Sequence, residues 1–97
     1  MDKLATDHLH WELEAEAGDT IEVSLDRAAN VQLLDRPNYE NYLNRQPYSR
    51  LEGGYTTFSP VEFDVPTDGV WHLVIDLGGG PGQVRAVPTV ISKASIA

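Results

Sequence analysis

The sequence predicts a single-domain, mostly antiparallel β-sandwich of about seven or eight short strands, and three observations lead to this fold class. Apolar and polar residues alternate along most of the chain, as in strands with one buried and one solvated face. Turn-forming residues interrupt the alternation at the short intervals typical of sandwiches and barrels. The chain has 97 residues, 41% of them hydrophobic, which suits one domain with one modest core. The folded core is expected over residues 8–90, with ends that fray.

The first strands are predicted on either side of a Gly18-Asp19 turn. Apolar residues alternate over 9–15 and again over 21–25. Two alternating runs joined by such a turn predict an antiparallel hairpin. The polar positions of this hairpin are expected to face solvent, because they carry Glu12, Glu14, Glu16 and Glu22.

Further strands are predicted over 31–34, 55–58, 61–65, 70–77 and 84–90. Pro60 and Pro66 bracket the 61–65 run, so this strand is expected to be short or at a sheet edge. The 70–77 run is the longest apolar strand and is the best candidate for the centre of a sheet. Most of the core is expected from Trp11, Leu13, Ile21, Val23, Val31, Leu33, Phe63, Trp71, Leu73, Ile75 and Val84.

Regular alternation is lost in the segment 38–55, where an elaborated loop with at most a single helical turn near residues 40–43 is predicted. All four tyrosines of the chain lie in this segment or at its end. Residues 27–50 contain four arginines against Asp35 and Glu40, a balance of +2 in a chain of net charge −8. Loops of this length are usually functional or mobile, and Tyr and Arg are enriched in binding hot spots. The candidate binding residues are Asn38, Tyr39, Asn41, Tyr42, Asn44, Arg45, Tyr48 and Arg50.

Several short motifs spread over the chain form a recognisable set. They are residues 29–35, Asn38-Tyr39 with Tyr42, Gly53-Gly54, Ser59-Pro60, Val65-Pro66, Gly69-Val70-Trp71 and residues 76–79. This set resembles the small bacterial domain-of-unknown-function family numbered eighteen eighty-three, over roughly His8 to Val90. The resemblance implies a compact β-sandwich, sometimes found beside Toll/interleukin-receptor-type domains, and it implies no particular activity.

Composition and charge exclude several classes of function. Seven Lys and Arg against fifteen Asp and Glu disfavour nucleic acid and anionic membranes as partners. The absence of cysteine removes disulfides, thiolate metal sites and cysteine nucleophiles. No secretory signal and no apolar run of about 18 residues is present, so the default expectation is a soluble cytoplasmic protein without a cofactor.

Candidate chemical motifs have simpler structural explanations. His8, His10 and His72 offer imidazoles for a metal, but an exposed pair at the start of a strand is favoured, and no metal is predicted. The glycines of 78–82 precede a β-like stretch instead of a helix, which excludes a phosphate loop. Asp26 and Asp35 are expected to cap turns. With no nucleophile elbow and no tuned carboxylate pair, the chain is not predicted to be an enzyme.

Three functional hypotheses remain. The leading hypothesis is a non-catalytic binding or sensing module for a protein or small ligand, with the segment 38–55 as its contact surface. An alternative explanation for Tyr39, Tyr42 and Tyr55 is that they cover the open end of the sandwich. The second hypothesis is carbohydrate binding through tyrosine rings and the Asn38, Asn41 and Asn44 amides. The third is assembly through an exposed sheet edge, which Pro60 and Pro66 would limit.

Overall fold

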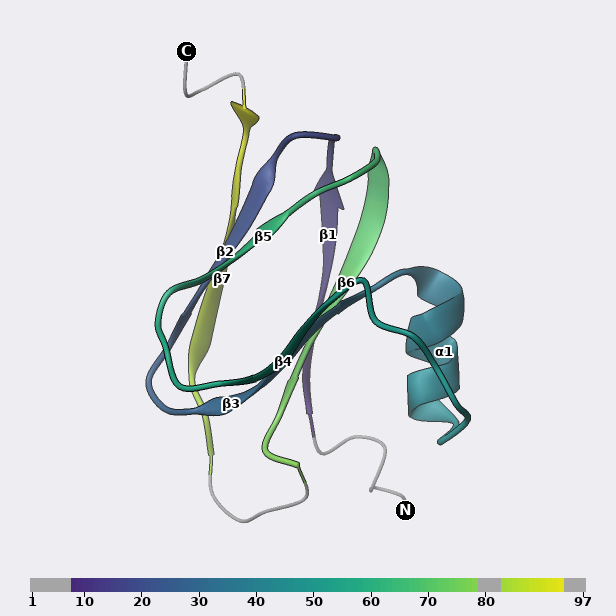
Figure 1. Cartoon of the computed structure of the whole chain (residues 1–97), viewed down its shortest axis with the longest axis vertical. Coiled ribbons are helices and arrows are strands. Elements are labelled where there is room, and N and C mark those ends of the chain that lie inside the picture. The colour runs from purple at the N-terminus through teal and green to yellow at the C-terminus, as the bar shows by residue number, and fades with distance from the viewer. Residues whose placement is uncertain (1–7, 79–82, 94–97) are drawn as a thin grey trace.

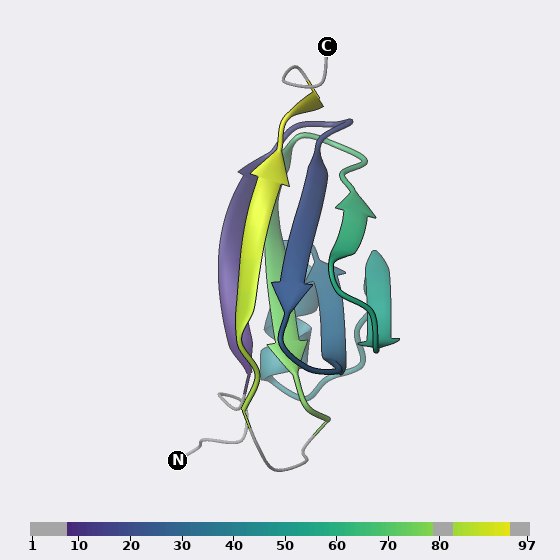
Figure 2. The same ribbon diagram turned by 90° about the vertical axis from the view of Figure 1, so that its left-hand side faces the viewer.

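The computed structural model describes residues 8–78 and 83–93, which form seven strands and one helix. These elements are β1 (Leu9–Ala15), β2 (Thr20–Leu25), β3 (Ala29–Leu34), α1 (Arg36–Leu43), β4 (Glu52–Thr56), β5 (Val61–Asp64), β6 (Gly69–Asp76) and β7 (Ala86–Ile91). The strands form two antiparallel sheets, of order β1-β6-β3-β4 and β5-β2-β7, which pack face to face (Figures 1 and 2). The predicted β-sandwich is confirmed.

The strands on either side of Gly18-Asp19 form as predicted, but the predicted hairpin is wrong. β1 pairs with β6, whereas β2 pairs with β5 and β7, so the turn carries the chain from one sheet to the other. The Asp19 carboxylate holds this crossing, because it accepts hydrogen bonds from the backbone N–H of Glu16 at 2.9 Å and of Lys93 at 3.1 Å. Alternation shows which side chains are buried, but it does not distinguish strands paired edge to edge from strands packed face to face.

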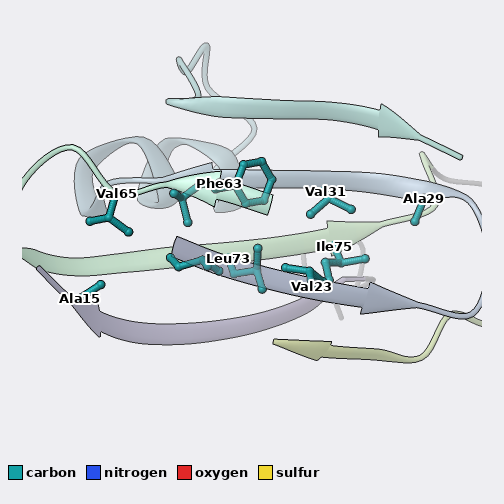
Figure 3. Packing of buried hydrophobic residues seen from close by; sticks show 10 residues of the cluster. Ala15, Val23, Ala29, Val31, Phe63, Val65, Leu73 and Ile75 are labelled. Atoms are coloured by element: carbon teal, nitrogen blue, oxygen red, sulfur yellow. The ribbon is translucent and has the colours of Figure 1, made fainter. Parts of the chain in front are cut away.

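The main hydrophobic core lies between the two sheets (Figure 3). Ile21 and Val23 of β2 and Leu33, Leu73 and Ile75 of the larger sheet have no exposed surface. β6 lies between β1 and β3, as expected for the most apolar strand. Seven of the predicted core residues are buried, and the other four are partly buried against them, namely Trp11, Leu13, Trp71 and Val84.

The proline-flanked strand and the ends of the chain follow the sequence closely. β5 is four residues long and forms an edge of the smaller sheet, as Pro60 and Pro66 indicated. The last strand begins at Ala86, slightly later than predicted. The predicted glycine-rich turn falls mostly on residues 79–82, and the predicted fraying falls partly on 94–97; these residues, like 1–7, lie outside the described ranges.

The segment 38–55 differs most from the prediction of an elaborated loop. It contains most of helix α1, a connecting strap of residues 44–51, and β4 with its two glycines. The helix begins because the Asp35 carboxylate accepts a hydrogen bond from the Asn38 backbone N–H at 3.0 Å, and because Pro37 has a helical φ in the first turn. Gly53 is required in β4, since a Cβ there would collide with the backbone of Val31 and Gln32.

Candidate functional site

Helix α1 covers the outer face of the four-stranded sheet, on the side away from the main core (Figure 1). Residues of β3 and β6 that point to this face are therefore buried as well. Leu34 and Val74 have no exposed surface, and Gln32 and His72 are 6% and 4% exposed. Because both faces of β6 are covered, apolar residues occur at the positions that point to either face of this strand.

A histidine–tyrosine cluster, formed by His8, His10, His72, Tyr39 and Tyr42, lies between this sheet face and the helix. His10 Nε2 and His72 Nδ1 are 2.8 Å apart, and the two rings are within 5° of parallel. The Tyr39 ring stacks on both imidazoles, with centroid distances of 4.1 Å to His10 and 4.8 Å to His72. His8 Nε2 lies 3.3 Å from the Tyr39 hydroxyl. The cluster thus joins the start of β1, the middle of β6 and the helix.

The short nitrogen-to-nitrogen distance constrains the protons of the His10–His72 pair. One ring must donate and the other accept, so the two imidazoles cannot both be cations while this bond persists. Burial lowers the pKa of His10 and of His72 from the ordinary value of 6.5. The neighbouring His72 and His8 rings lower the pKa of His10 further, while the Glu12 carboxylate acts in the opposite direction on both residues. The pair is therefore uncharged at neutral pH.

The expectation of an exposed histidine pair at the start of a strand is wrong. His10 is half-buried and is bonded to His72, which lies on a neighbouring strand. His10 Nε2 and His72 Nδ1, each of which could ligate a metal, are bonded to each other instead. Within residues 8–78 and 83–93, no group of three or more His, Asp or Glu side chains is arranged to hold a metal ion.

Tyr42 of the cluster and a further tyrosine, Tyr48, fasten the helix and the strap to the sheet. The Tyr42 hydroxyl donates to Asp76 Oδ2 at 2.7 Å, and burial together with this bond raises the pKa of Tyr42. The Tyr48 hydroxyl donates to Gln32 Oε1 at 2.8 Å. The idea that tyrosines cover the open end of the sandwich is therefore wrong for Tyr39 and Tyr42, which lie against a sheet face. Tyr55, on β4, is 69% exposed.

The strap is held by backbone hydrogen bonds near its beginning, middle and end. Gln46 N–H donates to the Asn41 carbonyl at 2.8 Å, and Ser49 N–H donates to the Asn38 side-chain oxygen at 2.8 Å. Leu51 N–H donates to the Leu33 carbonyl at 2.9 Å. In Figure 1 the strap runs beside α1 and leads into β4. It has no regular structure, yet its course is fixed by these bonds.

The eight candidate residues fall into two groups. Tyr39, Tyr42 and Asn38 hold the helix and strap in place, and the half-buried Asn41 supplies a carbonyl to the same network. Asn44 is the C-cap residue of the helix. Arg45 and Arg50 are exposed along the strap, and Tyr48, although its hydroxyl is bonded to Gln32, remains 37% exposed. Among the described residues, neither arginine forms an ion pair with a carboxylate.

Three exposed apolar residues outside the eight candidates continue this surface. Leu51, Tyr55 and Phe58 are 42%, 69% and 77% exposed, on β4 or directly beside it. In the sequence these three residues are surrounded by polar residues and glycines. This was the available signal that they are exposed, because such neighbours provide no apolar face for a core. The surface therefore extends from the strap along β4.

These features define the protein as a two-sheet β-sandwich with a helix and strap fastened to one outer face. A family model described as a domain of unknown function, DUF1883, matches residues 6–94, and the chain belongs to this family. The match confirms the resemblance predicted from the motifs. No curated protein and no solved structure matches the chain. No helix in the described part is long and apolar enough to cross a membrane.

Proposed function

We propose that this domain is a non-catalytic binding module whose contact surface is the strap, with Arg45, Tyr48 and Arg50 as anchors. One observation carries the proposal: the strap is fixed along its length by hydrogen bonds, yet these three side chains stay exposed. A surface that is already ordered loses little conformational entropy when a partner binds. Exposed Arg and Tyr on such a surface are of the residue types that dominate binding energies.

Charge indicates the chemistry of the partner. The strap holds two guanidinium groups on a chain of net charge −8. Guanidinium groups bind carboxylates and phosphates in a bidentate manner. An extended polyanion such as nucleic acid would be repelled by the rest of the molecule. The partner we infer is a protein or small ligand that presents one or two acidic groups.

The contacts of the histidine–tyrosine cluster and of Asn38 argue against two other roles, catalysis and carbohydrate binding. Tyr39 covers one face of both His10 and His72, and the facing nitrogens of these rings are bonded to each other. This arrangement hinders their use as a catalytic base. The Asn38 side chain is engaged with Asp35 and Ser49, so it is poorly placed to bind sugar hydroxyls. A glycan array tests the carbohydrate alternative directly.

The proposal is tested by affinity capture from the native cell extract with the Arg45→Ala/Arg50→Ala variant. We expect recovery of the partner to fall about tenfold, which corresponds to losing about 1.4 kcal/mol of binding free energy. The matched control is Arg27→Ala/Arg85→Ala, which removes the same charge elsewhere on the exposed surface. Capture that is equal for the two double variants would contradict the strap as the contact surface.

A further inference from the structure

Three of the four sheet edges are protected against pairing with another strand. Such edges are usually blocked by proline, by charge or by short length. β5 has only four residues and is flanked by Pro60 and Pro66, and β7 contains Pro88. β1 exposes Glu12 and Glu14. An added strand would therefore meet an obstacle at each of these edges.

The edge formed by β4 is less protected. β4 has no proline, its one charged residue, Glu52, stands at its first position, and within the described residues it pairs only with β3. Figure 2 shows β4 at the outside of the molecule. Tyr55 is exposed on the strand itself, and Leu51 and Phe58 are exposed just beyond its ends. The edge thus combines unprotected backbone with large apolar side chains.

The register shows which backbone groups of β4 face outward. The Leu33 carbonyl accepts a hydrogen bond from the strap, so the backbone groups of Leu33 face β4. Backbone direction alternates along a strand, so those of Val31 face β4 too, toward its partner Gly54. The neighbouring residues Gly53 and Tyr55 then direct their N–H and C=O groups away from the sheet. These are the groups to which an additional strand would bind.

We propose that the partner contributes an extended acidic peptide, which adds to β4 as a fifth strand of the larger sheet. The proposal rests on the proposed function and names its partner class. Arg50 Nη2 would be 3.6 Å from a Cβ on Gly54, so the guanidinium lies beside the middle of β4, within reach of a carboxylate on the added strand. Tyr55 and Phe58 would contact its apolar residues. Backbone hydrogen bonds supply the affinity and the side chains the specificity.

Charge favours an acidic peptide over a second copy of the chain. Residues 44–58 carry Arg45 and Arg50 against Glu52, a balance of +1, which leaves −9 on the rest of the molecule. Two copies paired through β4 would bring two positive surfaces and two acidic bodies together. An acidic strand meets the positive surface instead, and complementary charge also fixes which partners are accepted.

The test begins with a library of random linear peptides displayed on phage and selected on the wild-type domain. We expect the selected peptides to contain Asp or Glu among β-branched residues, with no proline in the middle. A synthetic peptide of the selected sequence is then used as the probe. In its presence, amide hydrogen exchange at Gly53 and Tyr55 should slow at least about tenfold, because these N–H groups become bonded.

A pair of variants separates the backbone contribution from that of the side chain. Tyr55→Pro removes the outward N–H, and Tyr55→Ala keeps it while removing the same ring. We expect Tyr55→Pro to weaken binding of the synthetic peptide at least about tenfold more than Tyr55→Ala does. The exchange measurement on the wild-type domain needs no substitution, so it decides the question if Tyr55→Pro fails to fold.

Several outcomes would overturn the proposal. These are a selection that enriches no peptide or only basic ones, unchanged exchange at Gly53 and Tyr55, equal binding by the two variants, or a dimer that already protects these amides. If the Arg45→Ala/Arg50→Ala variant loses capture while exchange at β4 is unaffected, the strap is the contact surface and strand addition is wrong. If capture is equal for both arginine double variants, the proposed function itself has failed.

Discussion

The imidazoles of His10 and His72 bind each other, and this bond makes the attachment of the helix sensitive to acid. Their pKa values are lowered from 6.5, first by burial. The unfolded chain therefore binds more protons than the folded chain once the pH falls below about 6.5. The contribution of the pair to stability is complete above that pH, and it is lost as the pH falls through the lowered values.

We accordingly expect the free energy of unfolding, measured with urea, to fall as the pH is lowered below about 6.5. The control is His72→Asn, which leaves an amide near the position of Nδ1 but cannot titrate. This variant should show a smaller decrease over the same interval. If the wild type and the variant lose equal stability, protonation of the pair does not control it.

The sequence identifies the residues of this cluster but not their contact. Alternation places His10 on one face of its strand and His72 on one face of another. Their contact depends on the register of β1 against β6, in which His10 is opposite Val74 and His72 is opposite Glu12. Register is determined by the packing of the whole sheet, so local patterning does not reveal it.

At the scale of the element, helix α1 depends on its N-cap. Asp35 Oδ1 accepts hydrogen bonds from both the backbone and the side-chain nitrogen of Asn38, at 3.0 and 2.8 Å. We expect Asp35→Ala to lower the free energy of unfolding by about 1 kcal/mol, as measured with urea. The control is Glu40→Ala, which removes the exposed ion pair with Arg36 and should cost less than about 0.5 kcal/mol. An equal effect of the two substitutions would contradict the role of the cap.

The helix is poorly signalled by its sequence because its buried side is aromatic and polar. Tyr39 and Tyr42 face the sheet, and no aliphatic residue repeats at helical spacing before Leu43. Asp35 and Pro37 are good start signals for a helix, but the same residue types also predict a turn. The short strand β4 is not predicted, because Gly53 and Gly54 are poor strand residues. The need for glycine at position 53 becomes apparent only when β3 lies beside it.

At the scale of the whole molecule, alternation and turn spacing were enough to predict the sandwich and most of its core. They were not enough to predict which strands pair, since β1 and β2 are consecutive but belong to different sheets. The prediction that the segment 38–55 is a loop was wrong for α1 and β4. Side chains attributed there to binding are partly used to attach the helix.

Charge is distributed unevenly over the molecule, which its net charge does not reveal. The chain carries −8, yet the strap and β4 together are slightly positive. Long-range repulsion by the acidic body disfavours polyanions, whereas the slightly positive strap does not repel an isolated acidic group. The proposed location of the contact surface can be tested by a map of the complex.

The most direct test is amide hydrogen exchange of the domain, free and in complex with the captured partner. We predict slower exchange in residues 44–56, which comprise the strap and β4, and unchanged exchange in β2, β5 and β7. Protection confined to the three-stranded sheet, with the strap unaffected, would contradict the binding surface proposed here.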